Sequence, residues 1–546
     1  MGFLKKHLVT AIVASCMLLF AARNAHAVDA TIDVTKKHQT IEGFGGGFMF
    51  GVWPYGQPYK DELYDSIFNK AGVNIVRVAN FYDPETDTGV IPELPMMKEV
   101  QALYPDVKVM MASWSPPKYL KEQDTIAGKL NNQQLTIKKA DGQFMYAEYA
   151  DYWLKSVKYF QDGGLKLGWI SIQNEPDWPA DYEGCLFTPT EGAAASYGKA
   201  LTAVYDKIKT LPEPPPFIGP DMTGPKGNNY TISQYVDNID LNKIAAVSHH
   251  FYNGETEADM KGVRQKVGSK TVFQTEWLTN EDQARWDGKI WSWFDHLQVV
   301  QRSLTIEDVS MYLIFALAYK TASTHCFFSQ DTVAKTYQAR PIYYGFKHFS
   351  KSIKRGMKRV DISASSGLQI SAFASDENDR VSVVVINTGA ATKLTLKGIP
   401  ATVDTGCAYQ TTKSGDTQPK KYEEIARFGT TVPEFPIDGT SVTSIELWNK
   451  VLTPVDAAPV RHTTSASALR ATLEQGTIAV HLPVPSGSRY SVSLFNASGK
   501  RVSSASNVNS ENAVSVHRFT RPAAAGVYLV VLDYAGTRTS VPVVVK

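Results

Sequence analysis

The chain has 546 residues, and a length of about 150 residues per domain predicts three or four folding units. Hydrophobic residues make up 43% and charged residues 20%, which excludes a disordered chain and a protein with several membrane spans. The formal charge is only +2, and aromatic residues reach 11%, a share that suits a protein that stacks flat rings against a ligand.

Residues 1–27 have the pattern of a secretory signal peptide. Lys5 and Lys6 precede an apolar run, 8–22, that is too short to span a bilayer, and the small-x-small sequence 25–27 suits cleavage. Cleavage would remove three basic residues and no acidic residue, which turns the formal charge from +2 into −1. We therefore expect a secreted or cell-surface protein with no stable membrane span in the mature chain. We expect no nucleic-acid partner, because phosphate binding needs a basic excess.

Cysteine spacing gives no sign of a disulfide scaffold. Cys16 lies in the signal segment, and Cys185, Cys326 and Cys407 are far apart with no CxxC pair. We expect neither a disulfide framework nor a zinc ribbon. At most one bridge can form, and the sequence leaves open whether Cys185 and Cys326 are joined.

Residues 28–350 alternate between short apolar runs and segments with helical spacing, such as 149–160 and 193–208, which predicts an α/β fold. Eight units over about 300 residues match a (β/α)8 TIM barrel with some long loops. A doubly wound open sheet is the alternative. The eight candidate strands are 41–48, 74–78, 107–113, 169–174, 216–219, 245–251, 271–275 and 310–316.

The rest of the chain alternates with a period of two, which predicts β-structure. Residues 351–450 predict a side antiparallel β-sandwich, and the strand-like piece 30–34 is a candidate to join it. Residues 451–467, rich in Pro, Ala, Ser and Thr, have the composition of an exposed linker. Residues 468–546 predict a small all-β domain.

Two glutamates lie where barrel enzymes hold their active sites, directly after apolar strands. Glu175 follows the fourth candidate strand and Glu276 follows the seventh. One such glutamate alone is more often an ion-pair partner or a helix cap. Two of them over one barrel mouth suit glycosidic bond cleavage, because one carboxyl protonates the leaving oxygen and the other attacks or stabilises the anomeric carbon. We therefore predict that Glu175 and Glu276 are catalytic.

Other residues at the predicted strand ends suit supporting roles. Arg77 beside a carboxylate would hold it ionised, while His250 and Tyr252 could orient it through hydrogen bonds. Trp114 and Trp178 could stack on a sugar ring, and plain core packing is an equal alternative for both.

Other chemistries fail the test of spacing. His249 and His250 have no third ligand at a recognisable interval and HExxH is absent, so we expect no catalytic metal and no other cofactor. The segment 43–48 has Phe48 where a dinucleotide-binding loop needs glycine. The chain has no P-loop lysine motif and no GxSxG elbow.

At these residues the chain resembles glycoside hydrolase family 30, a retaining family whose members pair a (β/α)8 barrel with a side β-sandwich. The resemblance covers residues 38–450. Its pieces are GFGG at 43–46, IVRV at 75–78, WSPP at 114–117, ISIQNEPD at 170–177, SHHFY at 248–252 and QTEW at 274–277.

The resemblance implies a role for each matched residue. Glu175 would be the general acid/base and Glu276 the nucleophile, with their carboxyl groups about 5 Å apart. Asn174 would bond the 2-hydroxyl of the sugar that is cleaved. The remaining implied residues around the nucleophile and the substrate are Arg77, His250, Tyr252 and Trp277.

Within the family, residues 146–169 and 348–356 look most like the bacterial xylanase branch. The resemblance implies an endo-β-1,4-xylanase whose partner is xylan or glucuronoxylan. Many members of that branch hold glucuronate with a Trp and paired Arg after strand eight, and this chain has YLIFALAYK at 312–320, so dependence on glucuronate stays open. A β-glucosidase, a glucosylceramidase-like enzyme and a β-1,6-glucanase are alternatives on the same fold. A non-catalytic sugar-binding surface protein is the alternative from another class.

Residues 468–546 resemble the C-terminal sorting domain of the type IX secretion pathway, through LFNASGKRV at 494–502, GVYLVVL at 526–532 and a basic last residue. The resemblance implies export through the periplasm of a Gram-negative-type cell, with the secretion machinery as a partner. A small carbohydrate-binding sandwich is the alternative, although it lacks an obvious aromatic platform.

Overall fold

The computed structural model of the chain divides into two units, residues 1–447 and 448–546. In the first unit it describes residues 27–48, 54–85, 93–254, 256–278, 292–320, 326–365, 367–413 and 420–447. In the second it describes 448–449, 469–474, 477–482, 489–496, 501–509, 515–520, 522, 526–534 and 537–545. The predicted linker and all but the last residue of the predicted signal peptide lie outside these ranges.

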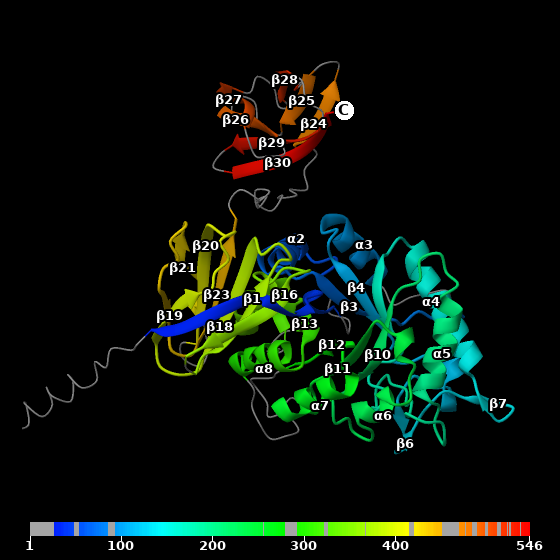
Figure 1. Cartoon of the computed structure of the whole chain (residues 1–546). Helices are drawn as coiled ribbons and strands as arrows, with labels where there is room; N and C mark the ends of the chain where they lie inside the picture. The colour runs from blue at the N-terminus through cyan, green and yellow to red at the C-terminus, as the bar shows by residue number, and fades with distance from the viewer. Residues whose placement is uncertain are drawn as a thin grey trace, which may run out of the picture. The chain divides into compact units, whose positions relative to one another are not determined.

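Eight parallel strands close into a barrel in the first unit (Figure 1). The barrel closes because β13 (Val309–Lys320) pairs both with β12 (Thr271–Glu276) and with β2 (Gly43–Gly47). The strands between them are β3 (Ile75–Ala79), β4 (Lys108–Ala112), β9 (Leu167–Ser171), β10 (Phe217–Met222) and β11 (Ala246–His250). The predicted (β/α)8 barrel is confirmed, and an open doubly wound sheet is excluded.

Helices follow the barrel strands and pack an apolar face against them. In α4 (Tyr146–Asp162) the buried side chains include Tyr149, Trp153 and Phe160, which recur at helical spacing. The predicted helix at 193–208 begins later, because Ser196 caps α5 (Tyr197–Ile208) by accepting from the Lys199 N–H. The other helices are α2 (Lys60–Tyr64) with a π-helical continuation (Asp65–Lys70), α3 (Glu93–Leu103), α6 (Ile232–Val236), α7 (Glu257–Val267), α8 (Trp293–Ile306) and α9 (Pro341–Ser350).

The glycines of β2 allow the neighbouring strand β3 to approach. A Cβ atom added at Gly45 would lie 1.8 Å from the carbonyl oxygen of Ile75. The glycine-rich segment 43–48 is therefore needed for strand packing inside the barrel, which agrees with the rejection of a dinucleotide-binding loop.

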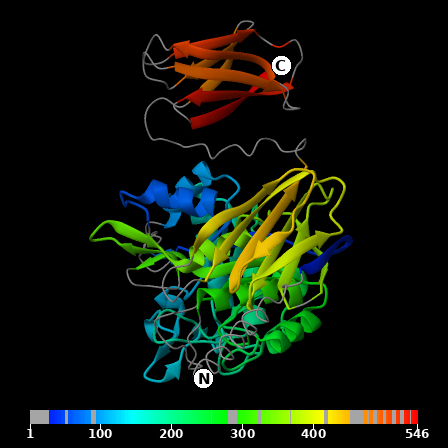
Figure 2. The ribbon, with the colours of Figure 1, turned by 90° about the vertical axis from the view of Figure 1, so that its left-hand side faces the viewer.

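A nine-stranded sheet forms the side sandwich in the same unit (Figure 2). Its strand β1 (Val28–Thr40) contains the segment 30–34 and pairs antiparallel with β16 (Lys358–Ala364) and parallel with β19 (Thr392–Lys397). The His348 ring of α9 exchanges hydrogen bonds of 2.9 Å with the hydroxyls of Thr411 and Ser444, which ties the sandwich to the barrel. The other strands are β17 (Gln369–Ala374), β18 (Arg380–Asn387), β20 (Thr405–Thr412), β21 (Lys420–Phe428), β22 (Phe435–Ile437) and β23 (Ser441–Trp448).

The second unit is a small all-β body, as predicted, with two sheets around one apolar core. One sheet contains β24 (Arg470–Glu474), β25 (Thr477–Leu482) and β28 (Ser515–Thr520). The other contains β26 (Arg489–Asn496), β27 (Arg501–Asn509), β29 (Gly526–Tyr534) and β30 (Thr537–Val545).

Two further findings bear on the sequence analysis. Cys185, Cys326 and Cys407 are buried and none of the three is in a disulfide, so no bridge joins Cys185 to Cys326. In the described parts of the chain, no helix is long and apolar enough to cross a bilayer.

Candidate active site

A cavity of about 600 Å³ lies at the carboxyl ends of the barrel strands and contains both predicted catalytic glutamates. Glu276 is the last residue of β12, and Glu175 follows β9 by four residues. The other lining residues are Trp114, Asn174, Trp178, Tyr182, Glu183, Thr223, Asn228, Tyr252, Asn253, Leu278, Phe315 and Tyr319. Among the described lining residues there is no lysine or arginine, so the wall offers no cation to an anionic sugar group.

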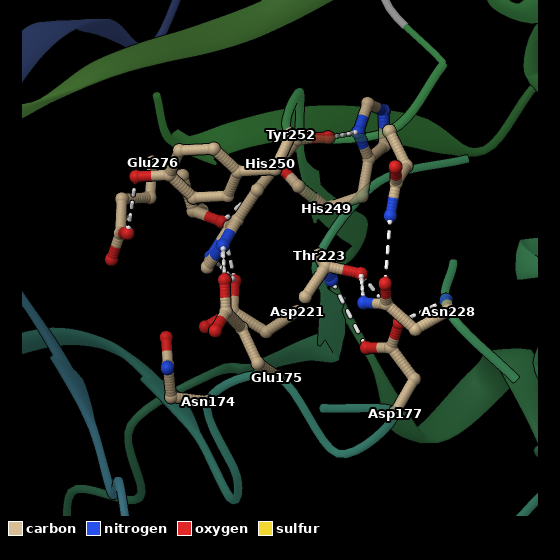
Figure 3. Close-up of polar contacts among 12 residues, drawn as sticks. Asn174, Glu175, Asp177, Asp221, Thr223, Asn228, His249, His250, Tyr252 and Glu276 are labelled. Carbon is tan, nitrogen blue, oxygen red and sulfur yellow. Dashed lines mark hydrogen bonds and ion pairs between the residues drawn. The ribbon is translucent and has the colours of Figure 1, made fainter. Parts of the chain in front are cut away.

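Both oxygens of the Glu276 carboxylate are held by donors (Figure 3). The Tyr252 hydroxyl donates to Oε1 over 2.7 Å, and Arg77 Nη1 donates to Oε2. The Glu276 side chain is almost buried, with an exposed fraction of 5% for the residue. The guanidinium and the phenol hold the carboxylate in one orientation through charge-assisted hydrogen bonds, which suits a nucleophile.

Arg77 connects this carboxylate to the rest of the site. Its Nη2 donates to Asn174 Oδ1 over 2.6 Å and to Asp221 Oδ2 over 2.9 Å. The guanidinium also lies 4.7 Å from the ring centroid of Trp114. Arg77 is fully buried and absent from the cavity lining, so it holds Glu276 and Asn174 in place from behind, beside the nucleophile as expected and outside the wall that a substrate would meet.

Glu175 has a different environment. Its backbone is left-handed with φ of +46°, and its N–H donates to the Asp221 carbonyl over 2.9 Å, which holds the turn after β9. Burial, reinforced by the negative charge of Asp177 and opposed by Arg77, raises the pKa of Glu175 to about 8. The carboxyl is therefore largely protonated at neutral pH, as a general acid must be.

His250 lies between the two carboxyl groups but hydrogen bonds to Glu175. Its Nδ1 is 3.0 Å from Glu175 Oε1. Burial lowers the pKa of His250 to about 4, so the ring is neutral at pH 7. We expected His250 in the surroundings of the nucleophile, and a ring nitrogen lies within 4.8 Å of a Glu276 oxygen. The hydrogen bonds to both oxygens of Glu276, however, come from Arg77 and Tyr252.

The two carboxyl groups converge closely. One oxygen of Glu175, one oxygen of Glu276 and a ring nitrogen of His250 lie within 4.8 Å of one another. Carboxyl oxygens this close suit the short carboxyl separation of retaining glycosidases, about 5 Å, better than the roughly 6.5–9.5 Å of inverting ones. The same three groups could surround a cation by distance alone, but the Arg77 guanidinium on Glu276 and the raised pKa of Glu175 both oppose one there.

The sequence analysis missed two buried aspartates that hold this arrangement. Asp221 lies in β10, and although burial opposes its ionisation, Arg77 and His250 outweigh burial and lower its pKa. Asp177 accepts hydrogen bonds from the Thr223 N–H over 3.0 Å and the Thr223 hydroxyl over 2.5 Å. An aspartate directly after the fifth candidate strand was the available signal for Asp221.

The predicted aromatic residues divide into two groups. Trp114 and Trp178 line the cavity, and Trp178 is 45% exposed at its rim. Trp277 is fully buried between Phe251 and His296, with ring centroids 6.4 Å and 4.5 Å away, and does not line the cavity. The expectation that Trp277 contacts substrate is therefore corrected, because its ring packs beneath α8.

Part of the chain is similar to a known family. Residues 68–190 match the glycosyl hydrolase family 30 TIM-barrel domain, a segment that includes Arg77, Asn174 and Glu175. The predicted enzyme class, a glycosidase, is confirmed by this match and by the glycosidase relatives described next.

Curated relatives of the chain differ in the activity that their names give. It is 24% identical to "Putative glucosylceramidase 1" of Caenorhabditis elegans, over 66% of this chain and 76% of that protein. It is 23% identical to "Glucuronoxylanase XynC" of Bacillus subtilis, over 66% and 78%. It is also 23% identical to "Endo-1,6-beta-D-glucanase" of Neurospora crassa, over 70% and 86%.

A solved structure has the same fold as this chain. The catalytic domain of the family 30 xylanase C from Talaromyces cellulolyticus superposes with a TM-score of 0.61 at 18% identity. The similarity covers 77% of this chain and 99% of that one. It supports the fold, a barrel with a side β-sandwich.

The raised pKa of Glu175 predicts how activity depends on pH. We expect kcat/KM to be maintained below pH 8 and to fall as the pH rises through about 8, because Glu175 loses the proton that it must donate. Asp177→Asn removes a negative charge that raises this pKa, so the alkaline limb should move to lower pH. Initial rates across pH 5–10 for both proteins test this, and an unmoved limb in the variant would contradict it.

The placement of the two tryptophans predicts that replacing one affects substrate binding and replacing the other affects stability. Trp178→Ala should raise KM about tenfold with little change in Tm, because the ring is half exposed at the cavity rim. Trp277→Ala should instead lower the free energy of unfolding by about 3–5 kcal/mol, because it leaves a hole in the core. Steady-state kinetics and urea unfolding of both variants distinguish these roles, and a stable Trp277→Ala protein with a raised KM would reverse them.

Proposed function

We propose that the protein is a secreted retaining endo-β-1,4-xylanase in which Glu276 is the nucleophile and Glu175 the general acid/base. The observation that carries this proposal is the pairing of two nearby carboxyl groups with opposite environments. Both oxygens of Glu276 accept hydrogen bonds, from Arg77 and Tyr252, while burial raises the pKa of Glu175 to about 8 and keeps it protonated. This is the division of roles that a double displacement needs.

In the first step, a carboxylate oxygen of Glu276 forms a bond to the anomeric carbon as the bond to the leaving oxygen breaks. Glu175 gives its proton to that oxygen, so the aglycone departs as an alcohol. Arg77 and Tyr252 keep the attacking carboxylate aligned through this step. Asn174, oriented by Arg77, is placed to bond the 2-hydroxyl of the sugar.

In the second step, Glu175 acts as a base. It has become a carboxylate and takes a proton from water, whose oxygen attacks the anomeric carbon and releases Glu276. The sugar leaves with its original configuration. The His250 ring that is hydrogen bonded to Glu175 is neutral, so it adds no positive charge beside this carboxylate. Glu175 can therefore take up the proton of the water.

Xylan is the favoured substrate on two grounds. The exposed rings of Trp178 and Tyr182, 45% and 56% exposed, extend the cavity wall beyond the carboxyl groups, as binding of several sugar units requires. The Bacillus subtilis relative is named a glucuronoxylanase. A glucosylceramidase-like β-glucosidase or a β-1,6-glucanase is the second candidate, because relatives with those names match equally long stretches of the chain.

One panel of substrates tests the proposal. The protein is incubated with glucuronoxylan, arabinoxylan, β-1,6-glucan and an aryl β-glucoside, and the products are sized. Short xylo-oligosaccharides are the expected result. Release of glucose or gluco-oligosaccharides would overturn the choice of xylan and leave the mechanism standing. Absence of product from all four substrates would favour a non-catalytic sugar-binding protein.

Export is a separate proposal. We infer that residues 1–27 direct secretion and that residues 468–546 act as a sorting address at the cell surface. Deletion of 468–546 should leave the protein in the periplasm, whereas the full chain should reach the surface or medium. Equal export of both forms would contradict the address.

A further inference from the structure

A chain of hydrogen-bonded polar side chains lies on the opposite side of Glu175 from Glu276, and only Asp177 among them has entered the chemistry described so far. Its members are Asp177, Thr223, Asn228 and Asn253 (Figure 3, where the first three are labelled). The chain begins at Asp177, which is fully buried, and leads to Asn228, which is exposed, and Asn253, which is partly exposed. Thr223, Asn228 and Asn253 all line the cavity.

The buried charge of Asp177 sets the direction of every hydrogen bond in this chain. A carboxylate only accepts, so the Thr223 hydroxyl must donate to it over 2.5 Å. That hydroxyl then accepts from Asn228 Nδ2 over 2.9 Å. Asp177 also accepts the Asn228 N–H over 3.1 Å, which fixes the backbone at that residue.

Asn253 completes the chain in the same direction. Its Nδ2 donates to Asn228 Oδ1 and to the Gly227 carbonyl, each over 3.2 Å. An amide nitrogen has two hydrogens, and Asn253 donates both of them in these two bonds. Its Oδ1 can still accept a hydrogen bond from a ligand. Asn228 Nδ2 donates one of its two hydrogens to the Thr223 hydroxyl, and it can donate the other to a ligand. The wall therefore presents a fixed donor and a fixed acceptor, which is what a sugar hydroxyl needs.

The position of this wall decides which sugar it meets. The glycone lies over Glu276 and Asn174, since the nucleophile must reach its anomeric carbon. Glu175 protonates the oxygen that joins glycone to leaving group. Figure 3 shows Glu276 on one side of Glu175 and the pair Thr223 and Asn228 on the other.

We propose that Thr223, Asn228 and Asn253, oriented by Asp177, form the binding subsite for an uncharged sugar ring on the leaving-group side of the scissile bond. This inference rests on the proposed function and adds to it a specificity for the leaving group. The described lining offers no cation, so the subsite selects a neutral ring through its hydroxyls.

Comparison of two substrates with the same glycone tests the subsite. A xylo-oligosaccharide has a sugar as leaving group, whereas a 4-nitrophenyl xyloside or xylobioside has an aryl group with no hydroxyls to bind. Asn228→Ala should lower kcat/KM for the oligosaccharide about tenfold, the effect of a lost hydrogen bond of about 1.4 kcal/mol, and change the aryl substrate less than twofold. Transfer of the glycone to an added xylo-oligosaccharide acceptor should fall by the same factor.

Asn229→Ala provides the matched control. Asn229 is an exposed neighbour whose Nδ2 is 3.4 Å from the Asp177 carbonyl, and it does not line the cavity. This variant should keep both rates. Equal loss on both substrates in Asn228→Ala, or no loss on either, would overturn the subsite while leaving the glycosidase intact. A native protein that cleaves neither substrate would instead overturn the proposed function, and the subsite with it.

Discussion

Glu276→Gln should abolish turnover, with kcat/KM falling about 10⁴-fold or more while substrate still binds. The amide has nearly the same shape: its oxygen can still accept from Arg77, and its NH2 group can donate to the Tyr252 hydroxyl oxygen, so the site stays assembled. An amide oxygen carries no negative charge and cannot form the glycosyl ester, so the first step fails. Initial rates on xylan and calorimetric binding of a xylo-oligosaccharide measure the two effects separately.

A glutamate-to-glutamine substitution outside the site is the control for Glu276→Gln. Glu148 is an exposed glutamate of α4, and Glu148→Gln should keep the full rate. If Glu276→Gln retained a rate within tenfold of the native protein, Glu276 would not be the nucleophile.

Glu175→Ala should lower kcat/KM on xylan by about 10²–10⁴-fold, the usual contribution of a general acid. The loss should be much smaller for an aryl glycoside with an acidic phenol, because that leaving group departs without a proton. The second step should then become limiting on the aryl substrate, since no base activates water. Rates on both substrates, measured at pH 6 where Glu175 is protonated in the native protein, test this division.

Rescue by azide distinguishes the loss of the general base in Glu175→Ala from damage to the rest of the site. The anion needs no deprotonation, so it should attack the glycosyl ester in Glu175→Ala and restore the rate on the aryl substrate with formation of a β-glycosyl azide. It should not restore Glu276→Gln. Equal losses on both substrates, without rescue by azide, would contradict the role of Glu175.

The barrel could be predicted from the sequence because its strands are buried on both faces. Each strand therefore reads as an apolar run, and the eight candidate strands overlap β2, β3, β4, β9, β10, β11, β12 and β13. The predicted start of α5 is too early because Ala194 and Ala195 are buried in a loop before the Ser196 cap. Burial alone does not distinguish such a loop from a helix.

The chemistry of the site was predictable where a residue ends a strand. Arg77, Glu175 and Glu276 are charged residues in or just after buried apolar strands. The barrel brings the carboxyl ends of these strands together at one end of the fold. What could not be predicted depends on neighbours from other strands. Asp177 looks like a loop residue until Thr223 is placed against it, and Trp277 looks like a sugar contact until α8 covers it.

Trapping of the glycosyl-enzyme tests the central claim most directly. The protein is incubated with a 2-deoxy-2-fluoro-xylobioside that carries a good leaving group, which slows the second step more than the first, and is then digested and mapped by mass spectrometry. We expect one fluoroxylobiosyl group per chain, linked as an ester to Glu276 and absent from Glu276→Gln. A label on Glu175 or another residue, or turnover that inverts the anomeric configuration, would contradict the account.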